Sequence, residues 1–182
     1  MTFCIWITGM PGSGKSSIVH KFLKKYKGKI ELLNMDKLRK GVMPSLKHTE
    51  KQRDTAYTEL VEIAEELVKR GNNIVIDATG NRRKWRDLAR SKIPNFSEIY
   101  IKCPLKICME REANRTDHSA VSNLYKKALY RLETGKEVEG VDDVIGVDVP
   151  YEEPEKPELV IESDKNNVEE AAMLLNEYVS KL

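Results

Sequence analysis

The residues best suited to chemistry form a glycine-rich loop near the start of the chain. The loop reads Gly9, Met10, Pro11, Gly12, Ser13, Gly14, Lys15, Ser16 and Ser17, and it contains the pattern GxxxxGKS. Glycines in this pattern let backbone amides wrap around phosphate oxygens, while the lysine reaches the β and γ phosphates and the serine hydroxyl ligates magnesium. We therefore expect the loop to bind ATP, with Lys15 at the phosphates and Ser16 at Mg²⁺.

The sequence on either side of the loop places it between a strand and a helix. Residues 3–7 are apolar, and hydrophobic residues recur at helical spacing between residues 18 and 26. A loop in that position lies at a helix N-terminus, where free amides and the helix dipole favour anions. A glycine-rich turn without a ligand is the alternative, and the flanking elements argue against it.

A second candidate group follows the apolar run at residues 30–33. Asp36 and Arg39 come directly after this run, and open α/β sheets bind ligands at the carboxyl ends of their strands. Asp36 could ligate magnesium or accept the proton of an acceptor hydroxyl, and Arg39 could bind an anionic acceptor. The alternative is a helix-capping aspartate beside a solvated arginine.

Asp77 closes the third apolar run and is a second carboxylate candidate for ordering the metal. It could instead cap the turn at residues 78–81. The cations Arg82, Arg83, Lys84, Arg86 and Arg90, with Trp85 among them, come next. They could bind a substrate phosphate or stack on a base, or they could form a solvated helix face.

Arg111 and Arg115 are candidates for a mobile lid over the reacting phosphates. Arginines in that role neutralise charge in the transition state and exclude water. Surface ion pairs with Glu110 and Glu112 are the alternative. We expect the lid to span roughly residues 111–135.

Five apolar runs alternate with helical patterns and must position these groups. The runs cover residues 3–7, 30–33, 73–76, 98–101 and 159–161. Such alternation predicts a parallel sheet with helices on both faces. The longest helical pattern covers about 50–70, a last helix begins near Asn167, and the proline- and acid-rich stretch 143–157 predicts an ordered loop.

Composition limits the class of protein. The 182 residues predict a single domain, 1–182, and the net charge of +2 gives no global field for nucleic acid or a membrane surface. The three cysteines lack CxxC spacing and predict buried thiols in a reducing compartment, and no targeting or transmembrane pattern is visible. We expect a cytoplasmic protein. The three histidines lack ligand spacing, which argues against a zinc site or a His-based nucleophile.

Several stretches together resemble the adenylyl-sulfate kinase family. The phosphate loop matches, Asp36 and Arg39 match its GDxxR element without the glycine, and residues 123–128 resemble its KGLYKKA element. Residues 96–105 are similar to the strand that leads to its lid. Residues 146–154 and 157–159 are similar to its GIDxPYEEPxxPE signature, which is the most specific match.

The resemblance implies a three-layer α/β/α P-loop kinase fold with a five-stranded parallel sheet, order 2-3-1-4-5, and a helical lid. It implies ATP- and Mg²⁺-dependent phosphorylation of the 3′-hydroxyl of adenosine 5′-phosphosulfate, a small-molecule nucleotide. In that interpretation Lys15, Asp36 and Arg111 are catalytic, Ser16 and Asp36 bind the metal, and Arg111 and Arg115 contact ATP. The expected substrate-binding residues are Asp36, Arg39, Arg53, Asp77, Asn81 and Lys126.

Two other interpretations stay open. The family has Ser-Pro-Tyr where this chain has residues 77–81, and this stretch looks more like kinases that act on polynucleotide ends, sugars or seryl-tRNA. The chain could therefore phosphorylate another small alcohol or an RNA terminus, although its charge does not favour nucleic acid. It could also be a regulatory module that binds ATP without transferring phosphate. A homodimer is compatible with the sequence, and no membrane partner is expected.

Overall fold

The computed structural model describes residues 2–42, 50–114, 123–138 and 143–182, with the backbone alone for 40–42. The strands in this part of the chain are β1 (Cys4–Thr8), β2 (Ile30–Asn34), β3 (Asn73–Asp77), β4 (Phe96–Lys102) and β5 (Leu159–Glu162). The helices are α1 (Lys15–Lys25), α2 (Met35–Val42), α3 (Glu50–Lys69), α4 (Arg83–Lys92), α5 (Leu105–Ala113), α6 (Leu124–Thr134) and α7 (Val168–Val179).

The strands form one parallel sheet in the order β2-β3-β1-β4-β5, which confirms the predicted order. Asp77 at the end of β3 pairs with Ile7 in β1 and with Asn34 in β2. The carboxyl ends of these three strands therefore meet at one edge of the sheet. This is the edge at which an open α/β sheet binds its ligand.

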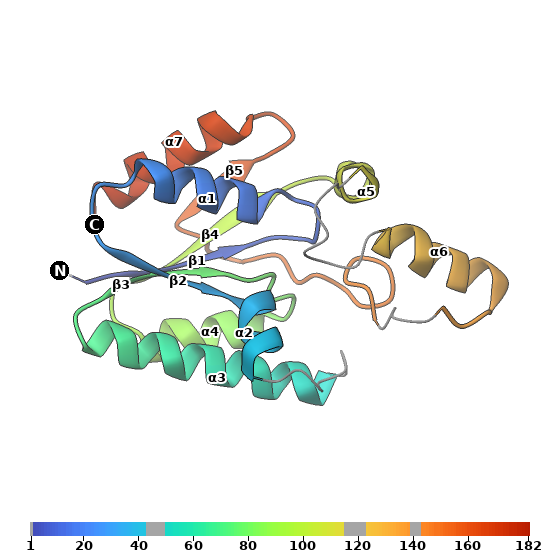
Figure 1. Ribbon diagram of the computed structural model, residues 1–182, viewed down its shortest axis with the longest axis horizontal. Coiled ribbons are helices and arrows are strands. Elements are labelled where there is room, and N and C mark those ends of the chain that lie inside the picture. Colours follow the sequence, from blue (N-terminus) through green and yellow to red (C-terminus); the bar gives the residue numbers. More distant parts are fainter. Residues whose placement is uncertain (1, 43–49, 115–122, 139–142) are drawn as a thin grey trace.

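Helices cover both faces of the sheet, as the alternation of patterns predicts (Figure 1). On one face α1 and α7 pack over the sheet, and residues such as Ile5, Phe22 and Leu175 fill the space between the layers. On the other face α3 and α4 pack around Trp6 and Leu60. The core on both faces is apolar because each face buries a row of side chains from β1 and its neighbours.

The predicted start of the last helix is confirmed in detail. Asn167 caps α7: its side chain accepts a hydrogen bond from the Glu170 amide, and the Glu170 carboxylate accepts one from the Asn167 amide. This reciprocal capping box satisfies amides that the first turn of a helix leaves unpaired.

Two helices lie beyond the edge of the sheet where the strands end: α6 falls within the region predicted as a lid, and α5 overlaps that region only at residues 111–113. Figure 1 shows α5 beside the start of α1 and α6 farther out. A small apolar cluster that includes Cys108, Tyr125 and Val144 joins them to the segment after residue 143. Asn123 starts α6 with a φ of 58° where the family element has glycine, and asparagine tolerates that left-handed conformation better than most residues. None of the helices in the described part of the chain has the length and apolar character needed to span a bilayer.

Candidate active site

The phosphate loop joins β1 to α1 and is held tightly against α5. Gly12 has a φ of 79° and Gly14 a φ of 94°, a region that favours glycine. A Cβ at Gly12 would also lie 2.3 Å from the carbonyl oxygen of Cys108 in α5. Gly14 therefore requires glycine for its backbone conformation. Gly12 requires glycine both for its backbone conformation and for the close approach of α5.

The loop presents the donors that a polyphosphate needs. Lys15 is 9% exposed, and its Nζ donates hydrogen bonds of 2.9 Å to the carbonyls of Gly9 and Met10. Ser16 follows at the start of α1, and the first turn of this helix, which the structure describes in full, carries no acidic side chain. A helix N-terminus of this kind attracts an anion through its free amides and its dipole.

Asp36 lies in the first turn of α2, just beyond the end of β2. The capping role belongs to Asn34, whose Oδ1 accepts a 3.0 Å hydrogen bond from the Lys37 amide. The capping alternative for Asp36 is therefore wrong. The Asp36 side chain is exposed at the edge of the sheet where the phosphate loop begins, and Arg39 on the same helix is half-buried.

Asp77 is only 3% exposed and lies between the two neighbouring strands. Its Oδ2 accepts a 2.8 Å hydrogen bond from the side-chain amide of Asn34. The two carboxylate candidates are thus linked through Asn34, which caps the helix of Asp36 and binds Asp77. The arrangement places one buried and one exposed carboxylate at the ends of adjacent strands.

These groups fit a magnesium ion that is bound chiefly through phosphates. Across the described ranges of the chain, no group of three or more His, Cys, Asp and Glu side chains could hold a metal on its own. Mg²⁺ is usually bound by one or two carboxylates with substrate phosphates and water. Ser16 with Asp36 or Asp77 matches that limited donor set.

Other predicted substrate-binding residues hold the segment after residue 143. Arg53 is 5% exposed and its Nη2 donates a 2.7 Å hydrogen bond to the carbonyl of Asp143. Asn81 is buried, and its Nδ2 donates a 3.1 Å hydrogen bond to the carbonyl of Pro150, while its Oδ1 has no partner among the described residues. Lys126 is exposed on α6. Arg115 lies outside the described residues.

Arg111 lies next to the phosphate loop, as the lid hypothesis requires. Its Nη1 is 3.9 Å from the position of a Cβ on Gly14. Its hydrogen bonds go to Ser163 and Cys103, and Glu112 accepts instead from the amide of Leu124. For Arg111, the contacts within the described part of the chain are thus with Ser163 and Cys103 and not the surface ion pairs with Glu110 and Glu112 that were the alternative to a lid role.

The cations after Asp77 have a different role from the one their sequence suggests. Arg82 pairs with Glu152 at 2.9 Å, Arg83 with Glu155 at 2.6 Å, Arg86 with Glu98 at 2.5 Å and Arg90 with Glu158 at 2.5 Å. We call this set the α4–glutamate clasp. It binds the proline-rich segment at residues 150–158 to α4 and β4, so most of these arginines are engaged within the protein rather than displayed to a substrate.

Arg86 is the centre of the clasp and shows that the solvated-face alternative is wrong for this residue. It is fully buried, and it also donates hydrogen bonds to the carbonyls of Gly80 and Glu152. Its guanidinium lies 5.6 Å from the ring centre of Tyr151. One side chain therefore joins the turn after β3, the proline-rich segment and β4.

Tyr151 links the clasp to the start of the phosphate loop, a connection that the sequence did not reveal. The Thr8 hydroxyl donates to the carbonyl of Thr79 at 2.6 Å and lies 2.8 Å from the Tyr151 hydroxyl. Because a hydroxyl has one proton, Tyr151 must donate to Thr8 in this pair. The residue that precedes Gly9 is thus fixed by the turn after β3 and by the proline-rich segment.

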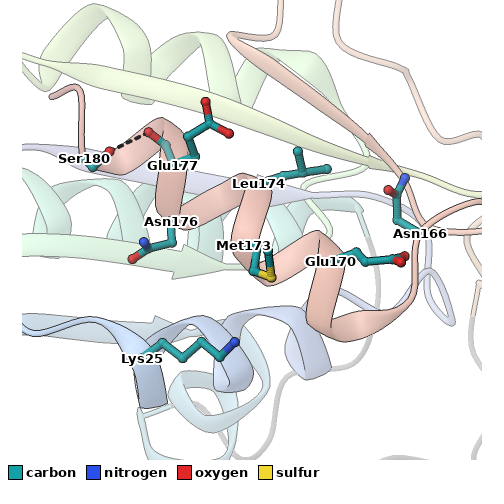
Figure 2. A pocket seen from close by; sticks show the side chains of 8 residues that line it. All are labelled: Lys25, Asn166, Glu170, Met173, Leu174, Asn176, Glu177 and Ser180. Carbon is teal, nitrogen blue, oxygen red and sulfur yellow. Dashed lines mark hydrogen bonds between the residues drawn. The ribbon is translucent and has the colours of Figure 1, made fainter.

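A cavity of about 440 Å³ lies beside the phosphate loop. It is lined by Met10, Leu105, residues 146–151 and Glu153. A larger cavity of about 560 Å³ lies elsewhere, between Lys25 and the outer side of α7 (Figure 2). Lys25 ends α1, whereas the phosphate loop precedes the start of that helix. The smaller cavity is the one with a residue of the phosphate loop, Met10, in its lining.

The phosphate loop at the first helix and the acidic side chains on adjacent strand ends define a P-loop kinase. The particular family follows from comparison with known sequences. The family model described as adenylylsulphate kinase matches residues 1–162, and the chain belongs to that family.

Individual relatives agree with this assignment. A probable adenylyl-sulfate kinase of Archaeoglobus fulgidus is 35% identical over 170 residues, which cover 92% of this chain and 99% of the relative. The adenylyl-sulfate kinase of Bacillus licheniformis is 32% identical, with 96% and 83% covered. The APS kinase CysC of Mycobacterium tuberculosis, solved in complex with AMPPNP and APS, superposes with a TM-score of 0.80 at 26% identity over 98% of each chain.

Proposed function

We propose that this protein transfers the γ-phosphoryl group of ATP to the 3′-hydroxyl of adenosine 5′-phosphosulfate in a magnesium-dependent reaction. The observation that carries the proposal is the family match over residues 1–162, which includes both the phosphate loop and the proline-rich segment. The names of the relatives and the ligands of the Mycobacterium tuberculosis structure point to the same acceptor.

The chain's own residues supply binding and orientation at the phosphates. Lys15 and the loop amides bind the β and γ phosphates, and Ser16 is the first candidate to hold magnesium. When bound, the ion neutralises charge on the phosphate oxygens. Arg111, together with Arg115, covers the transferring group and excludes water. Little covalent chemistry is required of the protein, because phosphoryl transfer depends mostly on positioning and electrostatics.

On the acceptor side, Asp36 orients or deprotonates the attacking hydroxyl. Arg39 and Arg53 bind the anionic part of the acceptor, and Asp77 is the second candidate to order the metal. Asn81 and Lys126 complete the proposed substrate-binding set. The buried Oδ1 of Asn81 supports its inclusion, because an acceptor oxygen that has no partner among the described residues can accept a hydrogen bond from a ligand.

The rival hypothesis of an RNA terminus as acceptor loses one of its two supports. It rested on residues 77–81 and on the cations of residues 82–90, and four of these cations pair with Glu98, Glu152, Glu155 and Glu158. An assay with γ-labelled ATP and a panel of acceptors tests the choice. We expect product from adenosine 5′-phosphosulfate, and product made only from another alcohol or from RNA would overturn the proposal.

The first mutational test concerns Asp36. We expect Asp36→Asn to lower turnover by about 10² to 10⁴, the usual effect of losing a general base, while ATP binding is retained. The matched control is Asp87→Asn, an exposed aspartate on α4, which should leave turnover unchanged. Full turnover by Asp36→Asn would remove Asp36 from the mechanism. Tight ATP binding by the wild type without any turnover would favour the regulatory module.

We also propose a cytoplasmic location, because the three cysteines are free and buried, as expected in a reducing compartment. A homodimer stays a prediction from the sequence. Static light scattering on the purified protein would measure the mass of the particle and decide between one and two copies.

A further inference from the structure

Ser163 is a buried hydroxyl beside the phosphate loop that the sequence patterns did not single out. It follows the last residue of β5 and is 5% exposed. Its amide donates a 2.9 Å hydrogen bond to the carbonyl of Lys102, which continues the pairing of β5 with β4. The backbone of Ser163 is therefore part of the sheet, and its side chain starts from a fixed position.

The side chain of Ser163 joins the phosphate loop to the lid arginine. Its Oγ donates a 2.8 Å hydrogen bond to the carbonyl of Ser13 in the loop. The same Oγ accepts a 3.1 Å hydrogen bond from Nη1 of Arg111, and the Ser163 carbonyl accepts a 2.7 Å hydrogen bond from Nη2. The single hydroxyl proton is committed to Ser13, so the oxygen is free to accept from the guanidinium.

This contact fixes the plane of the guanidinium as well as its position. Two nitrogens of Arg111 bind two oxygens of one residue, and Nη1 also lies 3.6 Å from the Sγ of Cys103. These contacts use three of the five N–H groups of an arginine. The Arg111 guanidinium, which carries the remaining N–H donors, lies beside Gly14, where the phosphate loop leads into α1.

We propose that Ser163 is a positioning residue, which aligns Arg111 with the phosphates of ATP through the shared hydroxyl. The inference rests on the proposed function for the identity of the reaction, but it concerns the nucleotide half of the site. A purely structural role at the end of β5 is the competing explanation. The two explanations differ in whether the effect of Ser163 passes through Arg111.

A double-mutant cycle separates the two explanations. Affinity for ATP is measured with a fluorescent ATP analogue, and KM for ATP and kcat are measured by product formation. We expect Ser163→Ala to weaken nucleotide binding or turnover by about 5- to 30-fold, which corresponds to about 1–2 kcal/mol. In the Arg111→Ala background the same change should have less than about a twofold effect, because its target is gone.

Two further variants keep the test decisive. Ser163→Thr retains the hydroxyl and should restore most of the loss. Arg111→Lys keeps the charge but replaces the planar guanidinium, whose two nitrogens bind the two Ser163 oxygens, by a single nitrogen, so it should behave like Ser163→Ala. An equal loss from Ser163→Ala with and without Arg111, or wild-type affinity together with wild-type turnover in Ser163→Ala, would overturn the proposal.

Ser97 provides the matched control. It is a buried serine in β4, 3% exposed, and its Oγ accepts a 2.9 Å hydrogen bond from the hydroxyl of Tyr178. Ser97→Ala should lower the melting temperature without changing nucleotide affinity. The binding measurements need no acceptor, so a failure of adenosine 5′-phosphosulfate as substrate would refute the proposed function and leave this inference standing.

Discussion

The phosphate loop and the proline-rich segment at residues 150–158 are built in opposite ways. Several contacts within the loop are local: the amide of Ser13 donates to Met10, and Lys15 donates to Gly9 and Met10, while Ser163 and Tyr125 bind the loop from other elements. The proline-rich segment is held by partners far away in the sequence, such as Asn81 for Pro150 and Arg86 for Glu152, separated by 69 and 66 residues. The loop therefore has a local network of its own, whereas these contacts of the proline-rich segment form only when the chain has folded.

The two regions also differ in what their charges do. Around the loop, Lys15 donates to the carbonyls of Gly9 and Met10, and Arg111 donates to Ser163 and Cys103. In the α4–glutamate clasp each arginine faces a carboxylate. We infer that the positive charges at the loop bind phosphates, whereas the ion pairs of the clasp stabilise the folded protein. Three changes test this division, from the largest expected effect to the smallest.

The largest effect is expected for Arg86→Met. Removing the guanidinium leaves Glu98, only 5% exposed, as a buried charge without its main partner. Loss of one member of a buried pair typically costs 3–5 kcal/mol, so we expect about that decrease in the free energy of unfolding, measured with urea.

Two companions sharpen this test. Arg70→Met removes an exposed helical pair with Glu66 and should cost about 0.3–0.5 kcal/mol. The double change Arg86→Met with Glu98→Leu replaces the buried pair by apolar groups and should recover much of the loss. A decrease below about 1 kcal/mol in Arg86→Met would contradict the role of the clasp in stability.

An intermediate effect, on binding rather than stability, is expected for Tyr125→Phe. The Tyr125 hydroxyl on α6 donates a 2.8 Å hydrogen bond to the carbonyl of Pro11 in the phosphate loop. A net hydrogen bond contributes about 0.5–1.5 kcal/mol, so ATP affinity should fall about 2- to 10-fold in isothermal titration. Tyr130→Phe, an exposed tyrosine on the same helix, should bind ATP like the wild type. Equal ATP affinities of the two variants would show that the hydrogen bond between α6 and the loop does not contribute to ATP binding.

The smallest effect concerns Glu152 at the rim of the clasp. A hydrogen bond from the Arg83 amide and the nearby Arg82 guanidinium hold the pKa of Glu152 below its ordinary value of 4.5. A depressed pKa in the folded state stabilises the protein above pH 4.5, and this contribution is lost as the pH falls through the folded-state pKa. Its size is below about 1 kcal/mol because the carboxylate is partly exposed.

Glu152→Gln reveals this contribution through its pH dependence. The variant should be less stable than the wild type in urea at pH 7, and the difference should shrink in acid, when the wild-type carboxylate is protonated as well. A deficit of the same size at both pH values would assign it to packing rather than to the charge of Glu152.

The sequence predicts the sheet well because apolar runs between turns are local features. The exception is β4, which begins at Phe96 although the apolar run suggested residue 98. Ser97, which the predicted run left out, is polar but buried, and it accepts a hydrogen bond from Tyr178. Hydrophobicity alone missed the start of this strand because the partners come from other elements.

The residues of the candidate site also differ in whether the sequence alone could predict them. The phosphate loop, Asp36 and Arg111 are recognisable from residue type and spacing, and the structure brings Arg111 to the loop. Ser163 and the hydroxyl pair of Thr8 and Tyr151 are not marked by any local sequence pattern. Their contacts depend on which strand ends lie side by side in the sheet. Individual contacts of this kind become visible only once the order of the strands is known.

The buried cysteines give the molecule two chemical reporters. Burial raises the pKa of Cys4 to about 12 and is the main cause of a similar value for Cys108, so neither thiol reacts readily while it is covered. Cys4 lies in the middle strand of the sheet, and Cys108 lies in the helix that touches Gly12. A thiol-specific reagent would therefore label Cys4 at the rate of global opening and Cys108 at the rate at which α5 lifts from the phosphate loop.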